Sequence, residues 1–349
     1  MTTGQTNHKA NPDLEWCYGA VHGVSRTFSI TIDRLEEPMA RHICQGYLLC
    51  RIADTIEDAG HIPPQTQTEL LSAYDRLLDR EDDYGPKAFL AEVEPWIPED
   101  RNADWEVLAR TPRVLRVFES LEEEPREIVR EPVRELVEGM AKFTDRYAAD
   151  GGLRLQTLDE LEDYCWYAAG TVGTLITGLV ARGTAPERTE TLQENSRSFA
   201  LLLQLVNIAK DVRRDFDEEN NVYLPEEWLE EEGVDVEEIT HEDHHEGVTN
   251  VIVRVIDRAE GYLDDAQRYL DALPEHRGNR LSAWAIPYLL AVGTLRELRE
   301  RPSEVIRGGD VKITRGEVHA VVTEFEGDNL TSEDVKNLRE EITNGPLHQ

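Results

Sequence analysis

Lysine is scarce in this 349-residue chain, in which six lysines stand beside thirty-one arginines. Acidic residues number 71 against 37 basic ones, which gives a formal net charge of -34 at pH 7. Because so acidic a surface repels phosphate backbones, the composition excludes a broad nucleic-acid-binding face. Strong acidity with little lysine predicts a surface adapted to concentrated salt, as in a halophile, where ions screen the self-repulsion. Two acids at helical spacing can therefore be ordinary surface.

Cysteine is also scarce, and long apolar runs are few. Cys17, Cys44, Cys50 and Cys165 form no CxxC pair, and all but Cys17 have apolar neighbours, which predicts buried free thiols. The N-terminus has no apolar signal-peptide region, and the last ten residues hold no membrane span. The longest weakly polar run, 165–181, contains three threonines and three glycines, which favours a buried helix. We expect a cytoplasmic protein, either soluble or peripheral at the inner face of the membrane.

Helical periodicity dominates the chain, and no alternating strand pattern stands against it. The class predicted is all-α. We expect a polar N-terminal segment over 1–20, a helical domain over 21–300 and a C-terminal tail over 301–349. Helices are expected over 39–59, 125–148, 159–183, 194–220, 248–273 and 280–298. Proline- and glycine-rich stretches at 60–67, 92–105 and 273–279 predict loops.

Three acids follow directly on the apolar run in "LLCRIADTIEDAG". Asp54, Glu57 and Asp58 share one helix face, because residues three and four apart are neighbours on a helix. Arg51 joins that face from one turn earlier. The flanking residues are too apolar for a freely solvated helix.

A second stretch, "LLLQLVNIAKDVRRDFD", repeats this arrangement. Asn207, Asp211 and Asp215 lie at successive steps of four, again after an apolar run. Like charges at the mouth of an apolar cavity repel one another, and bound cations would offset this repulsion. All-oxygen ligands favour a hard cation such as Mg²⁺, which carboxylates hold together with substrate phosphate. The two faces predict metal ions that clamp a diphosphate above a hydrocarbon tail, although two solvated acidic faces would give the same pattern.

Histidines gather in the acidic connector before residue 248. His241, His244 and His245 would suit a metal cluster, but a solvated loop on an acidic surface is the favoured interpretation. A carboxylate-bridged di-iron bundle needs paired Glu-x-x-His motifs on core helices. The one such match, Glu242 to His245, lies in this connector, which argues against that class.

Five motifs in order resemble one known family, the squalene/phytoene synthases, which are head-to-head prenyl transferases. They are "VSRTFS", "CRIADTIED", "YCWYAAGTVG", "NIAKDVRRD" and "VYLPEEW". The resemblance runs from about Val24 to Val321 and implies a single large helical bundle of the isoprenoid-synthase type with a central apolar cavity. "ADTIEDA", "WAIPYLLAVGTL" and "VKITRGE" resemble squalene synthases more than phytoene synthases. The implied reaction condenses two farnesyl diphosphates to presqualene diphosphate, which NADPH then reduces to squalene.

The resemblance also implies roles for individual side chains. Mg²⁺ and diphosphate would be held by Asp54, Asp58, Asp211 and Asp215, with Glu57 and Asn207 assisting. Diphosphate oxygens would be contacted by Arg26, Arg51, Ser25 and Lys210. Tyr164 matches the family's catalytic tyrosine, although an unperturbed phenol is a poor base near neutrality, so that released diphosphate is an alternative proton acceptor.

Aromatic and small residues complete this implied site. Tyr167 and Phe28 would face cationic intermediates, because ring faces attract cations, or would simply pack in the core. Ala168, Ala169, Gly170 and Gly173 would leave room for a prenyl chain, or would allow close helix packing.

Three positions depart from the family pattern. Arg214 stands where an acid is usual, Lys210 replaces an arginine, and Asn221 stands before "VYLP" where many members have arginine. The chain has no GxGxxG after a strand, so Lys312 and Arg315 are candidates for the NADPH phosphates by resemblance alone, and structural ion pairs would explain both equally well.

Two other functions fit the same sequence. A relative without a reductant would stop at phytoene, dehydrosqualene or presqualene diphosphate. A helical scaffold with no activity would leave the acids merely on the surface. Because substrate and product are lipidic, transient membrane contact is expected, whereas no nucleic-acid partner is.

Overall fold

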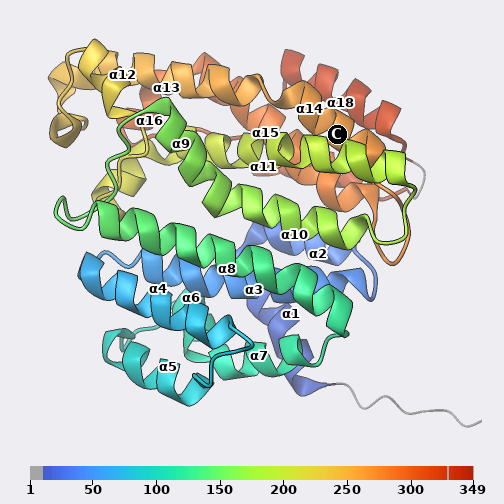
Figure 1. Cartoon of the computed structure of the whole chain (residues 1–349). Helices are drawn as coiled ribbons and strands as arrows, with labels where there is room; N and C mark the ends of the chain where they lie inside the picture. The colour runs from blue at the N-terminus through green and yellow to red at the C-terminus, as the bar shows by residue number, and fades with distance from the viewer. Residues whose placement is uncertain (1–10, 328–329, 349) are drawn as a thin grey trace, which may run out of the picture.

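The computed structural model describes residues 11–327 and 330–348, which form helices joined by short connections (Figure 1). No β-strand occurs within these ranges, and the only bridge there pairs Arg154 with Val222. The all-α prediction is confirmed.

The first half of the chain packs into one group of helices, which lies lowest in Figure 1. These elements are α1 (Pro12–Val24), α2 (Arg26–Arg34), α3 (Met39–Glu57), α4 (Pro64–Leu78), α5 (Pro86–Val93), the 3₁₀ turn η1 (Glu94–Trp96), α6 (Ala103–Ala109), α7 (Thr111–Glu119) and α8 (Glu123–Arg146).

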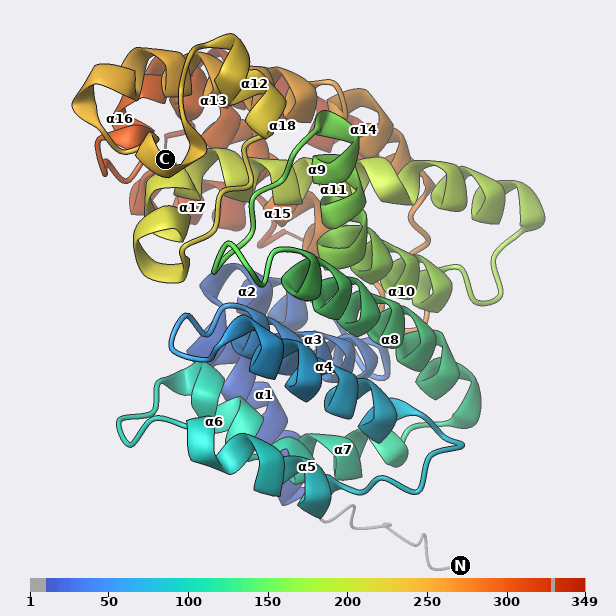
Figure 2. The ribbon, with the colours of Figure 1, turned by 60° about the vertical axis from the view of Figure 1, so that its left-hand side comes forward.

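The second half forms the upper group, and in the turned view of Figure 2 it again lies above the first group. Its elements are α9 (Leu158–Cys165), η2 (Trp166–Gly170), α10 (Thr171–Val180), α11 (Pro186–Arg214), η3 (Asp215–Glu219), α12 (Glu226–Glu231), η4 (Val236–Glu238), η5 (Glu242–His244), α13 (His245–Glu260), α14 (Leu263–Ala272), α15 (Leu281–Glu300), α16 (Pro302–Ile306), α17 (Arg315–Glu324) and α18 (Ser332–Asn344). Helices α8 and α10 pack together where the groups meet.

Helix α3 is buried around most of its circumference, which explains its unbroken apolar sequence. Ile43, Leu48, Leu49, Ile52 and Ile56 are all almost fully buried, and α1, α4, α6 and α8 pack against the helix. The positions of α3 that keep some exposure are Arg41, Tyr47, Arg51 and Asp54, and the last two lead into the acidic end.

Two of the described segments have π-helical winding. Both η2 and η3 are π-helical: η2 interrupts the helix that runs from α9 into α10, and η3 continues α11. Periodicity predicted continuous helices here, over 159–183 and 194–220. Single π turns inside helices are frequent at functional sites, and these two lie in the tyrosine motif and directly after the second acidic run.

Several element boundaries differ from the sequence expectation. Helix α1 falls largely within the N-terminal segment 1–20 and buries Cys17, while residues 1–10 lie outside the described ranges. The helix expected over 248–273 is divided at Gly261 into α13 and α14. The tail 301–349 contains α18, which buries Val335 and Ile342 and packs against α15.

The cysteine prediction is confirmed within the described chain, since all four thiols are free and buried, Cys17 included. Among the described helices, none combines the length and the apolar character that crossing a membrane requires.

Candidate active site

The first acidic helix end is the last turn of α3. Asp54 is partly exposed, Glu57 is buried, and Asp58 follows the helix with an exposed side chain. The amide of Gln67 donates to the carbonyl oxygens of Ile56, at 3.0 Å, and Glu57, at 2.6 Å. These bonds satisfy backbone groups that a helix end leaves unpaired, and they fix this turn.

The second acidic helix end is the last turn of α11 together with η3. Asp211 forms an ion pair with Lys210. The Arg214 guanidinium lies 3.2 Å from an Asp211 carboxylate oxygen and 3.4 Å from one of Asp215. Arg214, which departs from the family pattern, therefore bridges the two acids.

The two acidic ends lie next to each other. Gly60, just after α3, passes so close to η3 that a Cβ added there would lie 3.1 Å from the carbonyl oxygen of Glu218. The charge of Asp58 helps to raise the pKa of Asp215, and Glu219 acts in the same way on Asp58. The sequence predicted this juxtaposition, but it gave no role to Glu219.

Burial and mutual repulsion disfavour the charged form of these carboxyl groups. Burial first, then the Asp211 charge, raises the pKa of Asp215 to about 7. Burial first, then the Asp215 charge, raises the pKa of Glu219 to about 7. The pKa values of Glu57 and Asp58 are raised well above the usual range by desolvation and by neighbouring acids. Although the Asp58 side chain has exposed surface, the helix ends around it still displace much of its water.

Tyr164 links the first acidic end to the interior. Its hydroxyl lies 3.4 Å from Glu57 Oε2, to which it can donate, and 3.3 Å from the Tyr223 hydroxyl. Asn221 donates to the Tyr223 hydroxyl at 3.2 Å, and its Oδ1 accepts from the backbone of Leu153 at 2.8 Å. Burial raises the pKa of both tyrosines well above the usual range, so both phenols are protonated near neutrality.

Arg51 lies between the first acidic end and an aromatic pair. It donates to the Tyr47 hydroxyl at 2.9 Å and lies 3.6 Å from an Asp54 oxygen and 3.7 Å from an Asp104 oxygen. Phe28 stacks on Tyr47 with ring centroids 4.1 Å apart. Phe28 thus packs beside the site, and Arg51 has its guanidinium directed to the acidic end.

Other predicted residues lie around this centre. Ser25 caps α2 by accepting from the Phe28 backbone N–H at 3.1 Å, and Arg26 is exposed in the first turn of α2. Asn207 is exposed one turn before Asp211. Tyr167 packs edge-on against Phe143, with centroids 6.2 Å apart.

The small residues of the tyrosine motif serve close packing. A Cβ on Gly170 would lie 2.4 Å from the Trp166 ring. One on Gly173 would lie 3.1 Å from Ala200 of α11. For Gly173 the structure supports close contact between helices, whereas the neighbour of Gly170 lies within the same segment η2. Room for a prenyl chain beside Ala168 and Ala169, which are partly buried, stays a prediction.

The proposed cofactor residues are both exposed. Lys312 is exposed and pairs with Asp310 at 2.8 Å, and Arg315 is the exposed first residue of α17. Their role toward NADPH stays a prediction.

Sequence reasoning missed Asp104, Glu219 and Tyr223 as members of this site. Asp104 comes from α6, and no local pattern connects it with Arg51. Tyr223 stands inside "VYLP", whose position directly after the second acidic run was the available signal. A backbone pairing of Leu155 with Val222, at 3.3 Å, sets Tyr223 beside the tyrosine motif.

The geometry accords with the comparison to known families. The family model described as squalene/phytoene synthase matches residues 21–317. This chain belongs to the squalene/phytoene synthase family. The family consists of head-to-head prenyl transferases.

Two curated relatives illustrate the similarity. Squalene synthase LSS of Botryococcus braunii is 29% identical over 322 residues, which cover 90% of this chain and 63% of that protein. Presqualene diphosphate synthase of the same organism is 32% identical over 213 residues, covering 60% of this chain and 47% of that protein. The chain thus spans less than two thirds of either relative's length.

The fold also matches solved structures. A complex of TcSQS with the ligand BPH1237 superposes with a TM-score of 0.75 over 96% of this chain and 98% of the other, at 23% identity. The all-α isoprenoid-synthase fold is therefore established for this chain.

The acidic centre suits the magnesium ions that the family implies. Its donors are carboxylate oxygens from two helix ends, the ligand type that Mg²⁺ prefers. Glu57 Oε1 is buried without a hydrogen-bond partner, as expected of an oxygen that a cation would complete.

Proposed function

We propose that this protein is a squalene synthase. It would condense two farnesyl diphosphates to presqualene diphosphate and reduce that intermediate to squalene. The observation that carries the proposal is the meeting of two acidic helix ends beside the buried Tyr164. Two sequence features add support: the "DTIED" form of the first motif, and the similarity to a squalene synthase over nine tenths of the chain.

Each group in the centre has a chemical task under this proposal. Asp54, Asp58, Asp211 and Asp215 would hold Mg²⁺, with Glu57 assisting. Bound Mg²⁺ would neutralise the departing diphosphate and so favour ionisation of the allylic bond. Arg51 offers a guanidinium fork to diphosphate oxygens.

Tyr164 works in its protonated form. Because its pKa lies well above the usual range, the hydroxyl keeps its proton and acts as a hydrogen-bond donor. Glu57 is an acceptor within reach. The phenol therefore positions charge near the reacting carbons, and proton removal falls to an anionic acceptor such as released diphosphate. The rings of Phe143 and Tyr164, which meet edge-on at 5.4 Å, present faces that attract carbocations.

The reducing half of the reaction rests on resemblance. NADPH would supply the hydride that converts presqualene diphosphate to squalene. Lys312 and Arg315 are exposed cations three residues apart, which suits contact with cofactor phosphates. Membrane contact by the lipidic substrate and product, and a cytoplasmic location, belong to the same proposal.

A second candidate is a synthase that stops before reduction. The similarity to a presqualene diphosphate synthase at 32% identity favours it for the first half-reaction. Incubation of the purified protein with farnesyl diphosphate and Mg²⁺, with and without NADPH, separates the two. Squalene that appears only with NADPH supports squalene synthase. Presqualene diphosphate or dehydrosqualene formed regardless of NADPH supports the second candidate, and use of geranylgeranyl diphosphate alone indicates a phytoene synthase.

Substitutions of the acidic residues test whether the acidic centre catalyses the proposed reaction. Asp54→Asn and Asp211→Asn should each abolish turnover, because each removes a metal ligand while keeping side-chain volume. Glu190→Gln, which changes an exposed acid on the same helix α11, is the matched control and should retain full activity. Equal activity in all four proteins would favour the scaffold hypothesis instead.

A further inference from the structure

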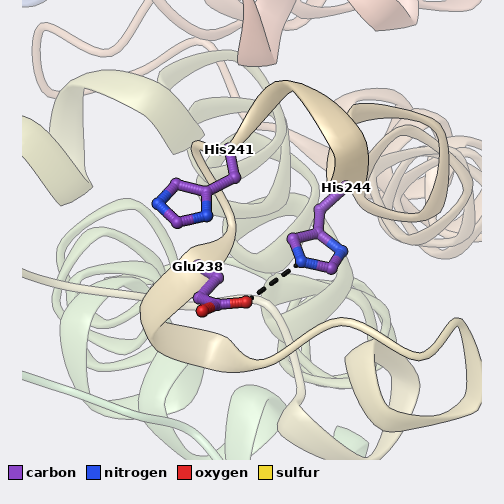
Figure 3. Close-up of side chains that lie close together, drawn as sticks. All are labelled: Glu238, His241 and His244. Carbon is purple, nitrogen blue, oxygen red and sulfur yellow. Dashed lines mark hydrogen bonds and ion pairs between the residues drawn. The ribbon is translucent and has the colours of Figure 1, made fainter.

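Three potential metal ligands converge in the connector between α12 and α13. Glu238 ends the 3₁₀ turn η4, and His241 and His244 flank and end the 3₁₀ turn η5 (Figure 3). Their spacing is three residues at each step. The two short turns and the residues between them bring the three side chains together.

The ligand atoms are already grouped. One atom from each of the three side chains lies within 4.8 Å of the other two, and His244 Nε2 lies 3.1 Å from Glu238 Oε2. Tetrahedral zinc with ligands at about 2.0–2.1 Å brings donor atoms about 3.4 Å apart. Rotations of exposed side chains suffice to close the remaining difference. His245, which the sequence placed in this cluster, instead has Nε2 3.2 Å from the Thr240 carbonyl oxygen.

We propose that Glu238, His241 and His244 form a binding site for a divalent transition-metal ion. Two imidazoles and one carboxylate suit Zn²⁺, Co²⁺, Ni²⁺ or Cu²⁺, whereas Mg²⁺ prefers oxygen ligands alone. The site is therefore chemically distinct from the all-carboxylate centre. Because Glu238 and His241 are exposed, water would complete the coordination.

The 3₁₀ turn η4, which carries Glu238, is anchored through the preceding residue, Glu237. The guanidinium of Arg154, itself 3% exposed, donates to the two Glu237 carboxylate oxygens at 2.7 and 3.1 Å. Arg154 also donates to the side-chain oxygen of Asn220 at 2.9 Å, directly after η3. A bidentate arginine restricts the Glu237 backbone, and this reduces the ordering entropy that metal binding would otherwise cost.

A metal ion bound at this anchored turn would stabilise the structure of the connector. A bound ion would join η4 to η5 and so fix the connector between α12 and α13. Through Arg154 the same connector contacts Asn220 at the end of the second acidic run. The proposal does not depend on the reaction that the acidic centre catalyses.

The test uses tag-free full-length protein that has been stripped with EDTA and kept in excess Mg²⁺ to occupy carboxylate sites. Zn²⁺ is titrated by calorimetry, and Co²⁺ binding is followed by its visible absorption. We expect one ion per chain and a thermal transition that rises with Zn²⁺. His241→Ala and His244→Ala should each weaken binding by at least about tenfold, because each removes a ligand.

His319→Ala is the matched control, since it removes an exposed imidazole from α17. It should bind Zn²⁺ as the unchanged protein does. Circular dichroism of the metal-free proteins checks folding, which should persist because the altered side chains lie at the surface. The proposal is overturned if the unchanged protein binds no Zn²⁺ under Mg²⁺, or if the double variant His241→Ala/His244→Ala binds it equally well.

Discussion

The hydroxyl groups of Tyr164 and Tyr223 lie 3.3 Å apart, and their ring centroids are separated by 4.9 Å. Fifty-nine residues of chain separate the two, yet both are buried beside Glu57. Each phenol has a single proton to donate, so the Tyr164 hydroxyl donates either to Glu57 or to the Tyr223 hydroxyl. The pair couples the interior of the fold to the first acidic helix end.

Removal of one hydroxyl should separate the roles of the two tyrosines. Tyr164→Phe keeps the ring but loses the donor next to Glu57, so we expect kcat to fall by about 10²-fold or more. Tyr223→Phe should lower kcat less, because its hydroxyl acts through Tyr164. Steady-state release of diphosphate measures both. Tyr288→Phe removes a buried hydroxyl bonded to Leu263, away from the centre, and should leave kcat unchanged; an equal loss there would indicate a general packing effect.

The acidic centre should make the metal-free protein less stable as pH rises. The pKa of Asp215 is raised from 3.8 to about 7 on folding, so the folded state binds the extra proton. Its contribution to stability is complete below about pH 4 and is lost as pH rises through 7. Asp215→Asn should therefore stabilise the metal-free protein at pH 8 by about 1–3 kcal/mol, and much less at pH 4. Urea unfolding at both pH values measures this.

Glu190→Gln serves as the control for that experiment, because its carboxyl is exposed. It should shift stability equally little at both pH values. Added Mg²⁺ should restore the stability of the unchanged protein at pH 8 more than that of Asp215→Asn. A variant that is no more stable than the unchanged protein at pH 8 would contradict the assignment of repulsion to this carboxyl.

Arg214 should compete with Mg²⁺ for the second acidic end. Its guanidinium lies within 3.4 Å of carboxylate oxygens of both Asp211 and Asp215. Arg214→Ala removes that cation, so half-maximal activity should require a several-fold lower Mg²⁺ concentration. The neighbouring variant Arg213→Ala, whose partner is Asp217, is the control and should leave the Mg²⁺ requirement unchanged. A higher Mg²⁺ requirement in Arg214→Ala would show that the arginine assists the metal.

Stability should rise with salt concentration because of the overall charge. A formal net charge of -34 makes the folded chain repel itself, and salt shortens the range of that repulsion. We expect the thermal transition to rise between about 0.1 and 1 M KCl, over which the Debye length falls from about 10 to 3 Å. Differential scanning calorimetry measures the transition, and sucrose of matched osmolality controls for water activity. A flat response to KCl would exclude charge repulsion as a major term.

The sequence predicted the helical class and both acidic ends because periodicity reports burial. Apolar residues at three and four spacing surround Asp54 and Asp211, and a helix carries such spacing directly into a common face. Asp104, Glu219 and Tyr223 escaped prediction because tertiary packing brings them together from α6, from η3 and from the segment after η3, and no local sequence pattern connects them. Ser25 and Asn221 are placed by hydrogen bonds that only coordinates show.

The π-helical winding of η2 has a consequence for the register of the chain. A π turn accommodates one residue more than an α turn over the same rise, and each α-helical residue rotates the following side chains by about 100°. Deletion of one residue within η2 would let α9 run into α10 as an ordinary helix. The face that carries Tyr164 would then turn by about 100° relative to the face that carries Gly173. The single extra residue thus sets the phase between the hydroxyl beside Glu57 and the glycine packed on α11.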